Sequence, residues 1–245
     1  MGERRGDAAT EPTDDERTRR RTARGENRLP PGLAVLVAAV AYALLPETLL
    51  FAPRFVIPAL ELALLVAVVA TNPVRVVRRT RWSRGVSISL AGIVVVTNLV
   101  ALGMLISSLT KPDTSGGSLL LGAVQVWLTN VIGFGLLYWE LDRGGPVARH
   151  ELPREEFPAA DWRFSQDENG DNVSEVARGS SEQAGWVPTF VDYLYLSLTN
   201  SSAFSPTDTM PLTTRAKALM GVEATAALFV TLLVIARAVG SFTGG

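Results

Sequence analysis

Long apolar runs, rather than apolar residues at regular spacing, dominate this chain. Four follow one another in the first 141 residues and a fifth lies near the C-terminus; they cover Pro31–Phe51, Phe55–Thr71, Val86–Leu109, Ser118–Leu141 and Ala216–Val239. A helix of about 20 residues crosses a hydrocarbon core of about 30 Å. The pattern predicts an all-α integral membrane protein with about five transmembrane helices. The second run is short, and we expect it to pair with the first as a tight hairpin broken near Pro46, Pro53 and Pro58.

Polar stretches divide these runs into units. Residues 1–29 carry eight arginines against seven acidic residues, which predicts a disordered cytoplasmic tail. Residues 142–186 read as an acidic hydrophilic loop. Polar backbone at membrane depth is tolerated only where it is buried in protein or lines a water-filled cavity. Residues 187–213 carry a run of hydroxyl and amide side chains and lie between apolar runs, so we expect them to form a re-entrant half-helix, about Pro188–Asn200, and a polar turn. The remaining units are three N-terminal helices over 30–110 and single spans over 118–141 and 214–240.

Composition narrows the function. The chain is 47% hydrophobic, with a mean hydropathy of +0.23, a net charge of −1, no cysteine and one histidine, His150. The net charge argues against a basic surface that would bind nucleic acid, and the lack of cysteine excludes a thiolate metal site or a disulfide. We find no phosphate loop, Ser/His/Asp set or metal spacing, and therefore expect no enzyme, cofactor or metal. Frequent Ala, Val and Arg with only two lysines are typical of high-GC bacterial coding, which favours a bacterial cytoplasmic (inner) membrane.

Arginine placement predicts the orientation. The loop between the second and third runs, residues 74–84, carries five arginines and is expected to be cytoplasmic, as is the N-terminus. The third run then crosses outward and the fourth inward. The half-helix would enter the membrane from the cytoplasmic face.

The stretch from Leu196 to Thr213 reads LSLTNSSAFSPTDTMPLT. It resembles the pore helix and selectivity filter of two-span potassium channels, which run apolar-Ser-apolar-x-T-x-T-T-V-G-Y-G-D-x-x-P-x-T before a basic residue and an inner helix. Asp208 takes the place of the filter aspartate. The resemblance implies an outer helix over 118–141, an inner helix over 214–240, a homo-oligomer (a tetramer if it forms a pore) and monovalent cations as permeant ions. The segment from Asp192 to Thr199 is also similar to bacterial multi-span membrane proteins that share a D-Y-L-Y-x-S-x-T ending.

The filter itself departs from that pattern. Ser205, Pro206 and Thr207 replace Gly-Tyr-Gly, and the positive φ angles that turn filter carbonyls inward favour glycine. Proline is fixed near φ −65°. We therefore expect a degenerate, weakly selective cation pore lined by hydroxyls and an amide. The alternative is a non-conducting sensor, assembly protein or small-solute carrier on the same scaffold. The filter-like residues are Thr199, Asn200, Ser201, Ser202, Ala203, Phe204, Ser205, Pro206, Thr207 and Asp208. The potassium-channel filter lies near the outer face, so the predicted orientation inverts the module.

Acidic residues in apolar surroundings are functional candidates by default. Asp208 could form an ion-attracting ring or cap a turn. Asp192 fits best as a partner of the half-helix dipole. Glu223 could be functional or a hydrogen-bonded packing residue facing Asn98, Gln125 or Asn130, and for Glu61 packing is the favoured interpretation.

Overall fold

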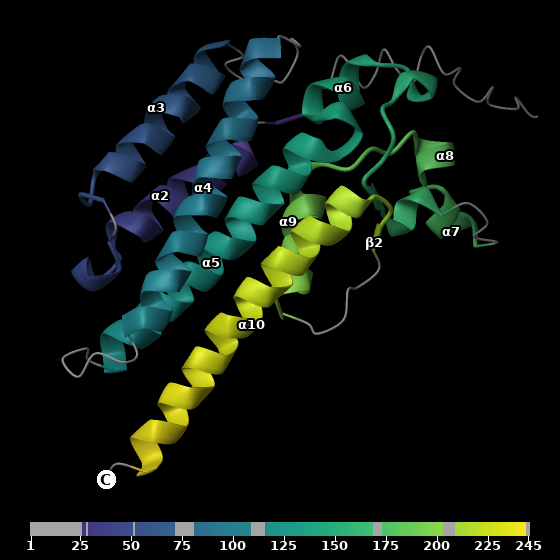
Figure 1. Ribbon diagram of the computed structural model, residues 1–245. Helices are drawn as coiled ribbons and strands as arrows, with labels where there is room; N and C mark the ends of the chain where they lie inside the picture. Colours follow the sequence, from purple (N-terminus) through teal and green to yellow (C-terminus); the bar gives the residue numbers. More distant parts are fainter. Residues whose placement is uncertain are drawn as a thin grey trace, which may run out of the picture.

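The computed structural model describes residues 26–27, 29–50, 52–71, 81–108, 116–168, 173–202 and 209–243. Their architecture is a bundle of helices with a small folded region at one end (Figure 1). Among the described residues, three helices are long and apolar enough to cross a membrane: α4 (Arg81–Ser108), α5 (Gly116–Leu141) and α10 (Thr214–Thr243). The protein is therefore an all-α protein suited to a membrane, as the apolar runs predict.

The first apolar run forms a shorter helix than expected. Helix α2 (Leu29–Ala43) ends before Pro46, and a short 3-10 turn, η1 (Glu47–Leu49), follows. The residue before a proline disfavours helical geometry, so Pro46 stops the helix. The guanidinium of Arg54 donates to the carbonyls of Ala43 and Leu45, which have lost their helical partners. Helix α3 (Val56–Thr71) then packs against α2, giving the predicted hairpin with helices of 15 and 16 residues.

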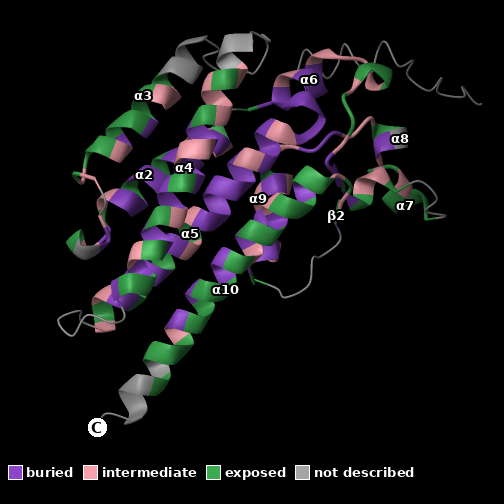
Figure 2. Ribbon diagram, viewed as in Figure 1, coloured by how far each residue is buried: buried purple, intermediate pink, exposed green. Residues whose placement is uncertain are grey.

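Helix α5 is the centre of the bundle. It packs on α4 and also on α9 (Phe190–Ser202), α10 and α2, and most of its residues are buried (Figure 2). The backbones of α4 and α5 approach closely at Gly133, where an added Cβ would lie 3.1 Å from Val95 Cγ2 and 3.2 Å from Val94 Cγ1. Gly133 therefore acts through its small size, as helix contacts in lipid require.

Helix α9 runs halfway along α5 in the opposite direction. It begins where α5 ends, with the Phe190 and Trp139 rings 5.9 Å apart. It finishes beside the middle of α5, where Trp127 Nε1 lies 3.5 Å from the Ser201 carbonyl oxygen. By Met210 the chain is back at the starting end, because β2 (Met210–Pro211) pairs antiparallel with β1 (Trp162–Arg163).

The stretch expected to be an acidic hydrophilic loop is folded into a cap, which we define as residues 142–168 and 173–186. It joins short elements: η2 (Asp142–Gly144), α6 (Pro146–Glu151), η3 (Arg154–Glu156), β1, η4 (Ser165–Asp167), α7 (Ser174–Ala177) and α8 (Ser181–Ala184). Trp162 is fully buried, with its ring 4.6 Å from that of Tyr138 on α5. Phe164 meets Tyr193 of α9 edge to face, at 5.3 Å. Aromatic packing therefore fastens the cap to α5 and α9.

The close contact at Gly133 makes a stability prediction. Gly133→Leu forces α4 and α5 apart and should lower the unfolding free energy by about 1–3 kcal/mol, the range for overpacking. Gly103→Leu in α4 is the matched control, because nothing lies within 4 Å of a Cβ added there. Thermal unfolding in detergent measures both. Equal melting temperatures would contradict the close packing of α4 on α5.

Candidate functional site

One face of α9 carries polar side chains at helical spacing. Ser197, Asn200 and Ser201 follow an i, i+3, i+4 pattern, so they share a face. All three are buried, and they point toward α5 and α10. The opposite side of α9 exposes Val191, Tyr195 and Leu198. The half-helix therefore turns its polar face into the protein and its apolar face outward.

Glu223 of α10 receives that polar face. Its side chain is completely buried, and both carboxylate oxygens lie among hydrogen-bond partners. Oε2 accepts from the Tyr138 hydroxyl at 2.6 Å and from the Asn200 amide at 2.6 Å. Oε1 is bonded to the Ser197 hydroxyl and, at 3.1 Å, to the Ser201 hydroxyl. A buried carboxylate is costly unless donors replace water, and here two neighbouring helices supply them.

Two asparagines extend this network across the bundle. The Asn130 amide donates to Ser201 Oγ and to the Glu223 carbonyl, both at 3.3 Å. The Asn98 amide donates to Asn130 Oδ1 at 3.2 Å. The connected residues, called here the Glu223 cluster, come from α4, α5, α9 and α10: Asn98, Asn130, Tyr138, Ser197, Asn200, Ser201 and Glu223.

The cluster can accommodate either charge state of its carboxyl group. Ser197 Oγ lies 2.8 Å from the Val131 carbonyl oxygen and is also bonded to Glu223. A hydroxyl has one proton to donate and lone pairs to accept. An ionised Glu223 can accept a hydrogen bond from Ser197, whereas a protonated Glu223 can donate to Ser197 while Ser197 donates to Val131. Rotation of one hydroxyl therefore matches gain or loss of a proton.

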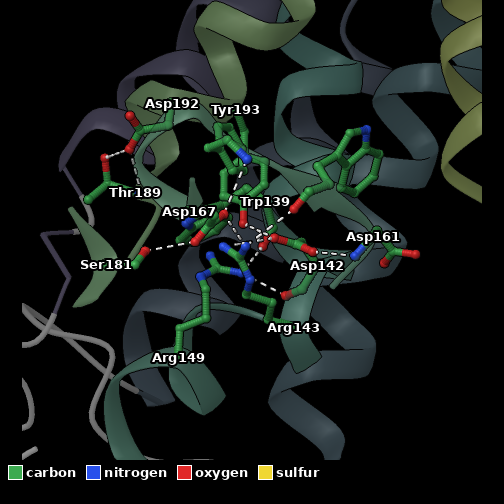
Figure 3. Close-up of polar contacts among 12 residues, drawn as sticks. Trp139, Asp142, Arg143, Arg149, Asp161, Asp167, Ser181, Thr189, Asp192 and Tyr193 are labelled. Atoms are coloured by element: carbon green, nitrogen blue, oxygen red, sulfur yellow. Dashed lines mark hydrogen bonds and ion pairs between the residues drawn. The ribbon is translucent and has the colours of Figure 1, made fainter. Parts of the chain in front are cut away.

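A second polar network lies at the junction of α5, α9 and the cap (Figure 3). Asp142 is fully buried; its Oδ1 accepts from the Asp161 amide at 2.7 Å and its Oδ2 accepts from the Tyr193 hydroxyl. Burial raises the pKa of the Tyr193 phenol well above its ordinary value, so this hydroxyl remains a donor. Arg143, at φ 49°, forms ion pairs with Asp142 and Asp167. The end of α5 is therefore bonded to the first turn of α9.

The same junction fixes the start of α10. Asp161 accepts from the Thr213 hydroxyl, and Arg215 donates to both of its oxygens. Arg149, completely buried, donates through Nη1 to the carbonyls of Trp139 and Asp142 at 3.0 and 2.8 Å. These bonds satisfy backbone carbonyls at the end of α5, which have no helical partner.

The structure distributes the predicted acidic residues among different places. Asp192 lies in the first turn of α9 and accepts from the Thr189 amide and hydroxyl at 2.7 and 2.8 Å, as expected for an acidic residue at a helix N-terminus. Glu61 lies in α3 away from the Glu223 cluster, buried, and within the described residues its Oε2 has no hydrogen-bond partner. Asp208 lies outside the described residues.

The predicted filter-like residues are only partly brought together. Asn200 and Ser201 bond to Glu223 rather than lining a turn. Thr199 bonds to the carbonyls of Tyr195 and Leu196 in its own helix, and Ser202 is exposed at the end of α9. The others, Ala203, Phe204, Ser205, Pro206, Thr207 and Asp208, lie outside the described residues. In the described ranges, no cluster of three or more His, Asp or Glu side chains could hold a metal ion.

Sequence reasoning missed Tyr138 and the cap network. Tyr138 is fully buried and donates to Glu223. Its spacing of eight residues from Asn130 places both on one face of α5, which was an available signal. The bonds from Asp142 and Asp161 join residues 19 to 54 positions apart, and no local pattern announces them.

Comparison with protein-family models, curated proteins and solved structures finds no match for this chain. The resemblance to a potassium-channel pore module therefore rests on the sequence pattern around α9.

The Glu223 cluster should tolerate an amide better than a truncation. Glu223→Ala leaves Tyr138 and Asn200 without their acceptor, and an unsatisfied buried donor costs about 1–3 kcal/mol. Glu223→Gln keeps an acceptor oxygen and the side-chain volume. We expect the melting temperature in detergent to fall clearly more for Ala than for Gln. A fall of similar size for both would contradict hydrogen bonding as the main role of Glu223 in the fold.

Loss of charge at Asp142 should also destabilise the protein. Asp142→Asn removes a buried partner of Arg143 and places an amide against donors, and breaking a buried pair costs about 3–5 kcal/mol. Glu168→Gln is the control, because Glu168 and its partner Arg163 are about half exposed and such pairs contribute at most about 1 kcal/mol. Thermal unfolding in detergent measures both variants. Equal losses of stability would show that the bonds of Asp142 are not essential for the junction.

Proposed function

We propose that α5, α9 and α10 form a pore module, and that copies of this chain, four if the axis is like that of a potassium channel, conduct monovalent cations with weak selectivity. The membrane is the bacterial cytoplasmic membrane, with the N-terminus inside. In this proposal α5 is the outer helix, α9 the pore helix and α10 the inner helix.

The path of α9 carries the proposal. A 13-residue helix starts at the cap end, reaches the middle of α5 beside Trp127, and is followed by a chain that is back at the cap by Met210. A surface linker between two spans would not require this excursion. A half-helix held between two long apolar helices, entering and leaving at one end, is the arrangement that a pore helix needs.

The Glu223 cluster removes the main physical objection to placing α9 in lipid. Polar groups at membrane depth must be satisfied by the protein, and Ser197, Asn200 and Ser201 are bonded to Glu223 or to the helices beside it. The exposed side of α9 is mostly apolar. Such a helix is compatible with lipid or with a neighbouring copy.

The outer face of α10 supports assembly of several copies. Large apolar side chains are exposed along it: Val222, Leu228, Phe229, Leu232, Ile235 and Val239. Of the most apolar 18 residues of α10, 33% are buried, against 67% of the corresponding residues of α5. Within the described part of one copy, the polar face of α9 points into the protein and leaves no aqueous path. In this proposal, the path forms where the C-terminal ends of α9 from several copies meet.

The distribution of arginine supports the proposed orientation. Arg84 near the start of α4 lies close to the cap, its Nε 3.8 Å from a Cβ added at Gly145. Arg143, Arg149 and Arg215 lie at the same end. Placing this end in the cytoplasm follows the positive-inside rule, and α9 then enters from the inside, inverted relative to a potassium channel.

A non-conducting sensor, assembly protein or carrier is the second candidate. The observation in its favour is the full engagement of Asn200 and Ser201 with Glu223, which leaves neither as a free ion ligand. Its distinguishing property would be a monomer in lipid, because one copy of the module cannot enclose a pore.

Conductance tests the proposal directly. Purified protein in planar bilayers should pass monovalent cations, and Asp208→Asn should reduce the preference for cations over anions if a ring of carboxylates attracts them. Glu168→Gln on the exposed cap surface is the charge-matched control and should change nothing. Absence of conductance over a range of voltage and pH would count against a channel.

Cross-linking tests the assembly. The chain has no cysteine, so a single introduced cysteine reports one position. Val222→Cys on the outer face of α10 should form disulfide-linked dimers in lipid, whereas Ala227→Cys, which is buried, should not. Monomers with both variants, together with a monomeric particle in lipid discs, would favour the non-conducting alternative.

A further inference from the structure

Glu26 occupies a set of hydrogen-bond donors at the start of α9. The residue belongs to the stretch expected to be a disordered tail, of which residues 1–25 lie outside the described ranges, yet its side chain is only 5% exposed. Its Oε1 accepts from the Phe190 backbone amide at 2.6 Å and from Trp139 Nε1 at 2.9 Å. A residue 164 positions away therefore satisfies the first amide of a 13-residue helix.

Two side chains from the cap, a guanidinium and an imidazole, complete the surroundings of this carboxylate. Oε2 lies 3.9 Å from Arg149 Nη2 and 3.7 Å from His150 Nε2. A helix N-terminus, an indole N–H, a guanidinium and an imidazole converge here, which is the donor set that binds oxyanions.

Glu26 fills the site incompletely. Among the described residues, its Oε2 has no hydrogen-bond partner, and Nε and Nη2 of the fully buried Arg149 have none either. A buried guanidinium with unused donors is costly. A phosphate group has more oxygens than a carboxylate, arranged as a tetrahedron, and could reach the helix terminus and Arg149 at once.

We propose that the start of α9 is a binding site for a phosphate group, and that Glu26 is its intramolecular competitor. In the structure the chain closes the site with its own carboxylate. Binding of phosphate would displace Glu26 and release residues 26–27 from the start of α9. This inference does not require that the protein conducts ions.

Competition makes a prediction with a definite sign. If Glu26 occupies the site more than nine-tenths of the time, its removal should tighten binding at least about tenfold, because apparent affinity scales with the free fraction. Binding of inorganic phosphate to the full chain in detergent, measured by phosphorus NMR line broadening, should therefore be stronger for Glu26→Ala, which lacks the acceptor oxygens, than for the native protein. His150→Gln in the Glu26→Ala background should weaken phosphate binding, and Glu156→Gln on the exposed cap should have no effect.

Release of the segment is measured separately. Spin labels at Asn27→Cys and Glu156→Cys, both exposed in the structure, should give a narrow distance distribution that broadens when phosphate is added. Lipid discs of phosphatidylcholine with and without phosphatidic acid, free of inorganic phosphate, show whether a lipid headgroup supplies the group. A Glu26→Ala variant that binds phosphate no more tightly than the native chain, or not at all at about tens of millimolar, would overturn the proposal.

Discussion

The buried carboxylate of Glu223 is the constraint on which the arrangement of α9 depends. It lies in a long apolar helix, where an ionised or unpaired group is costly. Its partners come from α5 and from the polar face of α9. That face is equally costly to leave unpaired, since Ser197, Asn200 and Ser201 would otherwise meet lipid or apolar side chains. The carboxylate of Glu223 and the polar face of α9 therefore satisfy each other's hydrogen bonds, and the half-helix is held between α5 and α10.

The cap performs the complementary task at the other end of α9. Asp142 joins the end of α5 to Tyr193, and Asp161 joins the cap to Arg215 at the start of α10. Three helix termini are thereby fixed within one buried network, and Trp162 packs against Tyr138 beneath it. A helix of 13 residues is only marginally stable alone in water. Here its position is fixed by polar bonds at both ends, which is consistent with a proposed pore helix whose terminus must be held at a set depth.

The sequence predicted where the long helices lie, because a long apolar run is enough to identify a helix that can cross a membrane. The runs predicted at Ser118–Leu141 and Ala216–Val239 appear as α5 and α10, and the half-helix predicted at Pro188–Asn200 appears as α9. Local chemistry also placed Asp192 in the first turn of α9. Helix α2 is shorter than the apolar run Pro31–Phe51, because it ends before Pro46, close to where the sequence predicted a break.

Composition and local spacing by themselves therefore determined the apolar helices, the short helix that precedes the last of them, and the arginine-rich ends of those helices. Tertiary structure alone decided that Glu223 meets Tyr138 and Asn200, that an acidic stretch folds into a cap, and that Glu26 reaches the start of α9. The physical reason is that a hydrophobic run marks a helix wherever it occurs. A hydrogen bond between buried groups depends on which helices are neighbours, and that choice is made by the packing of the whole bundle.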